Sequence, residues 1–217
     1  MLCQYTFREN LPGHAGSLVP WDRTRSRPRS SHVDLRTRRR RPRIEARAFP
    51  ADVLDRASLT AALQDAAGAL GPVEVFQFSP VPRADFMKPV LDTSADDLDA
   101  PLNFSVKGPV TAVHAVLPGM RALGRGTVLF VNGGSAVRPN PGLAGTSIAF
   151  AAESAYAGML HDALVPENIH VAQLIVPGAI RPEAEHSSPD VLAERLFDIH
   201  VQRDGFRHFA EPMAEDR

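Results

Sequence analysis

Continuous apolar runs constrain the fold of this chain more than any other feature of its sequence. GTVLFVN (residues 126–132) and IHVAQLIV (169–176) predict strands that are covered on both faces, and VEVFQF (73–78) predicts a third strand. Amphipathic patterns of helical period occupy residues 102–120 and 148–165, between consecutive runs. Such alternation is typical of parallel β-α-β units with right-handed crossovers. We therefore expect an α/β fold with a doubly wound parallel sheet.

Helix ends and buried faces can also be predicted. Residues 58–70 predict a helix with Ser58 as N-cap and Gly71 as stop, and residues 188–201 predict a last helix with Ser188 as N-cap and Pro189 in its first turn. Residues 43–55 predict a short strand and a turn. Pro109 either kinks the helix over 102–120 or opens a new first turn there. The expected core sides are Leu102, Val106, Val110, Val113, Leu117 and Met120 in one helix and Ala152, Tyr156, Met159, Leu160, Ala163 and Leu164 in the other.

The first 43 residues differ from the rest in composition. Residues 1–47 carry 12 Arg, no Lys and 4 acids, a net charge of +8, whereas residues 48–217 carry a net charge of −9. Segment 1–43 has no strand or helix period, so we expect a disordered or irregular arginine-rich segment before a folded unit over 44–217. Alternatives are a basic arm for nucleic acid or nuclear import, an organelle transit segment, or a displaced reading frame.

The composition limits the cellular compartments in which we expect the protein. A hydrophobic content of 44% is that of a soluble globular chain. No run approaches the ~18 apolar residues of a membrane span, and MLCQYTFREN lacks the apolar centre of a secretory signal. Cys3 is the single cysteine, so an internal disulfide is impossible. We therefore expect a cytoplasmic protein without a membrane partner.

Small residues follow each predicted strand. SPVP (79–82), GGSA (133–136) and PGAIRP (177–182) come directly after the three apolar runs. Parallel strands end at one edge of the sheet, and small residues there let a ligand approach the backbone. These loops either form a ligand-binding crevice or merely end the strands.

From about residue 44 the chain resembles the short-chain dehydrogenase/reductase family, whose members bind NAD or NADP on a Rossmann-like sheet. The resemblance rests on ADVLD, VEVFQFSPVP, NFSVKGPVTAVHAVLPGM, GTVLFVNGGSA and PGAI, in that order over some 150 residues. It implies that the dinucleotide would be bound by Asp52, Val53, Ser79, Pro177, Gly178 and Ile180. It implies no metal site.

The same resemblance places the family's Asn, Ser, Tyr and Lys tetrad on Ser105, Ser135, Phe150 and Ser154. In the family, the Tyr hydroxyl exchanges a proton with the substrate oxygen, and the Lys lowers the Tyr pKa and holds the ribose. Phe150 cannot donate a proton, and Ser154 carries no charge. We expect the nearby Glu153, Tyr156 and His161 to be structural and Lys107 to be solvated.

A second departure lies at the front of the chain. Residues 1–43 contain no Gly-rich turn after a strand, so the first strands of the family fold are missing or replaced, and dinucleotide binding is in question. The sequence therefore predicts an oxidoreductase with weak or lost activity, or a non-catalytic subunit or binding protein; a nucleic-acid binder is the least favoured function. By resemblance, an active form would take a small carbonyl or alcohol substrate under a lid over 183–201. Homo-oligomers would form through helices 102–120 and 148–165.

Overall fold

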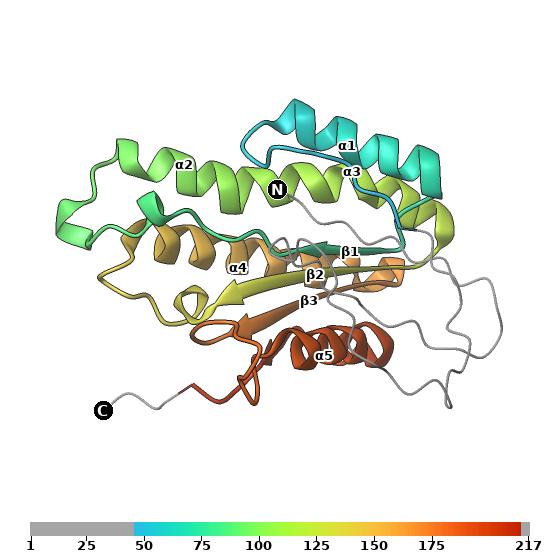
Figure 1. The fold of residues 1–217 in the computed structure, drawn as a ribbon. Helices are drawn as coiled ribbons and strands as arrows, with labels where there is room; N and C mark the ends of the chain where they lie inside the picture. The colour runs from blue at the N-terminus through green and yellow to red at the C-terminus, as the bar shows by residue number, and fades with distance from the viewer. Residues whose placement is uncertain (1–45, 214–217) are drawn as a thin grey trace, which may run out of the picture.

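The computed structural model describes residues 46–213, in which helices and parallel strands alternate (Figure 1). A π-helical segment, Asn103–Lys107, joins the second helix to the third. The elements in chain order are α1 (Arg56–Leu70), β1 (Val75–Phe78), α2 (Asp99–Leu102), α3 (Gly108–Leu123), β2 (Gly126–Gly133), α4 (Ala144–Leu164), β3 (Ile169–Val176), α5 (Pro189–Gln202) and β4 (Arg207–Phe209).

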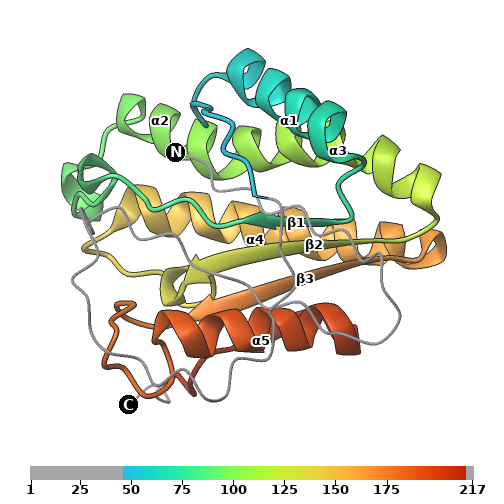
Figure 2. The ribbon, with the colours of Figure 1, turned by 45° about the vertical axis from the view of Figure 1, so that its right-hand side comes forward.

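The four strands form one sheet in the order β1-β2-β3-β4, and every neighbouring pair is parallel. Helices α1, α3 and α4 cover one face of the sheet, and α5 covers the other (Figure 2). This confirms the predicted α/β fold with a doubly wound parallel sheet. Strand β4, which pairs with β3 from Gln173 to Ile175, was not predicted because RHF is too short to give a strand pattern.

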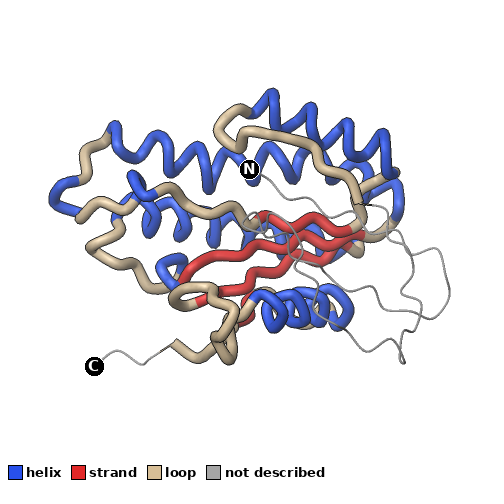
Figure 3. The backbone as a smooth tube through the Cα atoms, in the orientation of Figure 1, coloured by secondary structure: helices blue, strands red, loops and turns tan. Residues whose placement is uncertain are grey.

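Within the described residues, β1 pairs only with β2 and forms the edge of the sheet (Figure 3). Its side chains are nevertheless buried on both faces: Phe76 and Phe78 pack under α1 and α3, while Val75 faces α5. Edge strands usually carry charged or exposed side chains. The expected loss or replacement of the first strands stays a prediction, because it concerns residues that precede the described part of the chain. The arginine-rich segment 1–43 lies outside the described residues.

The sheet separates two apolar cores by the alternation of side chains along each strand. In β2, Val128 and Phe130 face α3 and α4, whereas Leu129 faces α5. The α3 stripe contacts the first core through Ala112, Val113, Val116 and Met120. Of the stripe predicted for this helix, Val113 and Met120 are buried, and the other members are half-buried at its flank.

Pro109 opens the first turn of α3, directly after the π-helical segment. One of the two predictions for this proline is therefore confirmed. In the turn before α1, Asp55 caps the helix, because its Oδ1 accepts from the N–H groups of Ala57 (2.9 Å) and Ser58 (3.2 Å). The prediction of Ser58 as N-cap was wrong, since a carboxylate three residues earlier binds the free N–H groups at the helix start.

Residues 46–55 contain no strand, so the expected strand is absent from the described part of the predicted range. Pro50 has no N–H to donate, and Asp52 Oδ1 accepts from Leu54 N–H (2.9 Å) to close a turn. The other predicted ends hold: Gly71 ends α1 with φ +93°, and Ser188 and Pro189 begin α5.

The inner face of α4 differs from the predicted one. Its buried residues include Phe150, Glu153, Ser154 and Ala157, whereas Met159 is 65% exposed. The prediction placed apolar residues inside. It was wrong for Met159 and Ala163, which are exposed, but it holds for Leu164, which is buried, and for Tyr156 and Leu160, which pack against the first core. Polar residues of α4 are buried as well because the facing positions of β2 and β3 carry polar side chains, which hydrogen-bond them.

Candidate functional site

The carboxyl ends of β1, β2 and β3 lie at one edge of the sheet, where the three predicted loops follow them. Ser79 lies just after β1 and accepts a hydrogen bond from Gln77 Nε2 (2.9 Å). Ser135 lies in the 3₁₀ turn Gly134–Ala136 after β2, and residues 177–180 follow β3. The structure therefore brings these loops to a common edge, where ligands of such sheets bind.

Gly133 is the last residue of β2, and Gly134 begins the 3₁₀ turn that follows it. A methyl group at Gly133 would lie 3.7 Å from Phe150 Cε2, and one at Gly134 would lie 3.3 Å from Met213 Cε and 3.7 Å from Pro177 Cα. Phe150 is buried with Ala136 and Ile175. We refer to Gly133, Gly134 and this apolar cluster together as the strand-end site. No titratable side chain belongs to the cluster.

The residue at which α4 begins affects which side chains occupy the places of the family's Tyr and Lys. The helix begins at Ala144, four residues earlier than the sequence predicted. The predicted pair Phe150 and Ser154 is buried, at 6% and 4% exposure. A shift by one helical turn toward the start would put the pair at Thr146 and Phe150, and Thr146 Oγ1 is buried with no partner among the described residues. Neither arrangement contains a tyrosine or a lysine.

Ser105 lies in the π-helical segment and is 2% exposed. π-Helical turns inside helices are frequent at functional sites. The Ser105 side chain hydrogen-bonds the carboxyl group of Glu153 on α4, and so does the side chain of Asn132 on β2. The place predicted for the family's Asn is therefore connected to a buried acid, which the sequence analysis had treated as structural.

Burial raises the pKa of Glu153 to about 8, although its hydrogen bonds with Asn132 and Ser105 act in the opposite direction. Its Oε1 has no hydrogen-bond partner within the described residues. Desolvation disfavours the carboxylate more than two hydrogen bonds stabilise it. Near neutral pH this side chain is therefore held mainly as the neutral acid.

A chain of hydrogen bonds continues from Asn132 to the edge of the sheet. Gln173 Nε2 donates to Asn132 Oδ1 (2.8 Å), and Ser154 Oγ donates to Gln173 Oε1 (2.9 Å). Arg207 on β4 donates from Nη2 to Ser154 Oγ (2.8 Å) and from Nε to Gln173 Oε1 (3.1 Å). Ser154 thus belongs to a buried polar network under α4 rather than to the apolar cluster around Phe150.

The other candidates for a proton donor have structural partners. Burial raises the pKa of Tyr156 to about 12, and its ring packs edge-on against Phe130 with centroids 6.3 Å apart. His161 Nδ1 lies 2.7 Å from the carbonyl oxygen of Val171. Lys107 is exposed, as expected.

The residues expected to contact a dinucleotide are spread around the carboxyl edge. Asp52 is exposed in the turn before α1, while Val53 is buried, and its Cγ1 would lie 2.9 Å from a methyl group added at Gly108. Gly178 has φ +79° and open space around it, and Ile180 is 53% exposed. Val53 therefore packs α1 against α3, and the loop after β3 offers the accessible surface.

Sequence reasoning missed Asn132, Gln173 and Arg207 altogether. Gln173 lies inside an apolar run and Asn132 ends one, and an uncharged polar residue in a buried strand was the one available signal. Arg207 gave no signal because β4 was not predicted. Within residues 46–213, no group of three His, Cys, Asp or Glu side chains is placed to hold a metal ion. In that same range, no helix has the length and apolar character needed to cross a bilayer.

Comparison with known proteins defines the family. The family model described as short chain dehydrogenase matches residues 17–191, so the chain belongs to this family. Human "Dehydrogenase/reductase SDR family member 4" is 30% identical over 96 residues, which are 44% of this chain and 34% of the human protein. This chain therefore matches about a third of the length of that relative.

Solved structures that share the fold include the following two. L-sorbose reductase from Gluconobacter frateurii, solved with NADPH and L-sorbose, superposes with a TM-score of 0.66 at 16% identity and covers 74% of this chain and 73% of its own. A short-chain oxidoreductase from Pseudomonas aeruginosa PAO1 with an atypical catalytic center has a TM-score of 0.55 at 20% identity, over 60% of this chain and 49% of its own.

Proposed function

We propose that this chain is a short-chain dehydrogenase/reductase-type protein that binds NAD or NADP at the strand-end site and has weak or lost oxidoreductase activity. The observation that carries the proposal is the environment of Phe150. Its ring is 6% exposed and packs with Ala136 and Ile175, where the sequence predicts the proton-exchanging tyrosine.

The chemistry requires a group that the strand-end site lacks. A bound nicotinamide would supply or accept the hydride. Reduction of a carbonyl compound also needs a proton at the substrate oxygen, and a general acid contributes typically 10²–10⁴-fold to such a step. Phenylalanine has no such proton, and the serine or threonine hydroxyls at the paired positions have no adjacent lysine. This arrangement supports only slow turnover, in which water supplies the proton.

The described residues offer groups that could bind part of a dinucleotide. Gly178 and the exposed Ser79 leave backbone and hydroxyl groups accessible at the ends of β3 and β1. We propose that Pro177, Gly178 and Ile180 contact the nicotinamide half, and that Ser79, Asp52 and the Val53 backbone contact the adenosine half. The family's Gly-rich turn would fall before residue 46, outside the described residues. Whether NAD or NADP is preferred depends on that segment.

The test compares two pairs of substitutions. Phe150→Tyr with Ser154→Lys restores the predicted pair, and Thr146→Tyr with Phe150→Lys restores it one turn earlier. NADPH binding is followed by fluorescence, and NADPH oxidation is followed with a panel of small ketones and aldehydes. We expect one pair to raise the rate at least tenfold. The single Phe150→Tyr variant is the control, because it adds the hydroxyl without the cation.

A second candidate function is that of a non-catalytic subunit. The outer face of α4 carries Met159 at 65% exposure and Ile148 at 43%, and Val165 just beyond its end is 60% exposed. We propose that this face and α3 form a homo-oligomer or an oligomer with an active relative, as the sequence predicted for 102–120 and 148–165. Light scattering should show an oligomer that Met159→Asp dissociates. A monomeric wild type at 50 μM would contradict this proposal.

The remaining expectations follow from the sequence. We propose a cytoplasmic location, because the single cysteine favours it. If active, the protein would take a small carbonyl or alcohol substrate. Binding to nucleic acid is not favoured, since residues 48–217 carry net negative charge.

A further inference from the structure

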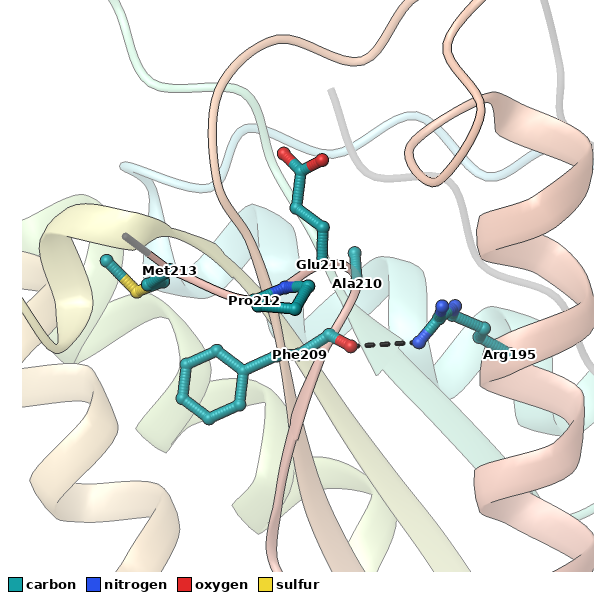
Figure 4. A pocket seen from close by; sticks show the side chains of 6 residues that line it. All are labelled: Arg195, Phe209, Ala210, Glu211, Pro212 and Met213. Atoms are coloured by element: carbon teal, nitrogen blue, oxygen red, sulfur yellow. Dashed lines mark hydrogen bonds between the residues drawn. The ribbon is translucent and has the colours of Figure 1, made fainter. Parts of the chain in front are cut away.

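A pocket lies between α5 and the segment that follows β4 (Figure 4). Its volume is about 410 Å³, and its lining residues are Arg195, Phe209, Ala210, Glu211, Pro212 and Met213. None of these residues is among those expected to bind the dinucleotide, although Met213 also packs against the strand-end cluster. Small-molecule sites are typically clefts of roughly 300–1,000 Å³ with apolar walls and a few placed polar groups. The lining therefore indicates what the pocket can bind.

Two hydrogen bonds hold one wall of the pocket in place. Arg195 Nη1 donates to the carbonyl oxygen of Phe209 (2.9 Å), as Figure 4 shows, and Ala210 N–H donates to the carbonyl oxygen of Ile175 on β3 (2.8 Å). Ala210 is fully buried. The wall is therefore tied to both α5 and β3 before any ligand arrives, and a preformed wall lowers the ordering cost of binding.

The pocket also holds two opposite charges that do not pair with each other. Among the described residues, the Arg195 guanidinium makes no hydrogen bond besides the one to Phe209, and the Glu211 carboxylate makes neither a hydrogen bond nor an ion pair. In Figure 4 the Glu211 side chain does not turn toward the guanidinium. Both residues are half-buried. Because no protein partner neutralises either charge, each can bind a group of opposite charge on a ligand.

The two charges together favour one class of ligand. A guanidinium presents its N–H donors in a planar fork that matches a carboxylate, whereas a carboxylate accepts from an ammonium group. A simple carboxylic acid would meet the like charge of Glu211, and a simple amine would meet that of Arg195; like charges that face one another weaken binding. A zwitterion has a partner for each charge.

We propose that this pocket binds a free amino acid with an apolar side chain. The carboxylate lies on Arg195, the ammonium group on Glu211, and the side chain against Pro212 and Met213. This site is separate from the proposed dinucleotide function, and neither depends on the other.

The test is equilibrium dialysis of labelled L-phenylalanine against the full chain, compared with two analogues that each lack one charge. Hydrocinnamate has no ammonium group, and phenethylamine has no carboxylate. We expect L-phenylalanine to bind with a dissociation constant of about 1 mM or lower, and both analogues to bind about tenfold more weakly. Absence of L-phenylalanine binding at about 10 mM, or equal affinity for all three compounds, would overturn the proposal.

Glu211→Gln is the sharpest variant, because Glu211 has no partner among the described residues whose loss could disturb the fold. It should weaken L-phenylalanine binding about tenfold and strengthen hydrocinnamate binding, since the like charge is gone. A merely structural effect would change both affinities in the same direction, and that result, or no change at all, would overturn the proposal. Glu194→Gln, an exposed acid on α5 outside the pocket, is the matched control and should change neither affinity.

Arg195→Gln tests the other charge. It should weaken the binding of L-phenylalanine and hydrocinnamate about tenfold and strengthen that of phenethylamine. Arg56→Gln, an exposed arginine on α1 at the opposite face of the sheet, is the matched control. Unchanged L-phenylalanine affinity in folded Arg195→Gln would overturn the proposal. If the loss of the bond to Phe209 prevents folding, the Glu211→Gln result decides.

Discussion

The buried acid Glu153 makes the stability of this protein depend on pH in a way that one substitution should remove. Its pKa is raised from 4.5 to about 8 in the folded state, so the folded chain holds a proton that the unfolded chain releases between these values. The contribution of this carboxyl group to the free energy of unfolding is therefore fully present below pH 4.5 and falls as the pH rises toward 8. Each pH unit in this range corresponds to ~1.36 kcal/mol.

Glu153→Gln replaces the acid with a neutral side chain of nearly the same shape. From pH 5.5 to pH 8.0 the free energy of unfolding of the wild type should fall by about 3 kcal/mol more than that of the variant. The reason is that only the wild type has a buried acid that keeps its proton when folded and releases it when unfolded in this pH range. A change of this size is a large share of the 5–15 kcal/mol typical of a folded domain. At pH 5.5 the two proteins should differ little.

Urea unfolding at several pH values measures this difference directly, since groups that titrate in both proteins cancel in the comparison. Glu183→Gln, which removes an exposed carboxyl group, is the matched control and should follow the wild-type curve. If wild type and Glu153→Gln lose stability in parallel between pH 5.5 and 8.0, the buried carboxyl group is not held neutral and the reasoning fails.

Two further predictions concern packing and capping. Gly145→Ala should destabilise the protein by several kcal/mol, because its methyl group would lie 2.7 Å from the backbone oxygen of Phe86. The control is Gly68→Ala on α1, where nothing lies within 4 Å, and it should stabilise the protein by ~0.5–1 kcal/mol. Similar unfolding midpoints for the two variants would refute the contact at Gly145. Asp55→Ala should cost about 1 kcal/mol in thermal unfolding through loss of the α1 cap, whereas Asp65→Ala, inside the helix and exposed, should cost little.

The parallel sheet could be predicted from the sequence because its signals are local. The runs that became β2 and β3 are apolar apart from two polar residues in each, and Gly71 and Ser188 mark helix ends through their own backbone preferences. These features do not depend on what the rest of the chain does.

The inner face of α4 could not be predicted because it is decided by its partners. Tyr156 and Glu153 are three residues apart, and hydrophobicity alone favours burying the tyrosine. Glu153 is inside because Asn132 and Ser105 meet it there, and both come from other elements. Arg207 was missed for the same reason, since its contacts form only when β4 pairs with β3. Long-range polar contacts leave little trace in the local pattern.

The central claim is that the dinucleotide fold is present while the proton-exchanging groups are absent. The most direct test is the rate of NADPH oxidation by the wild-type protein at saturating NADPH, with a broad panel of ketones and aldehydes. We predict that NADPH binds but is oxidised far below the 1–10³ s⁻¹ typical of enzymes. A kcat within that range for any carbonyl compound would contradict the account.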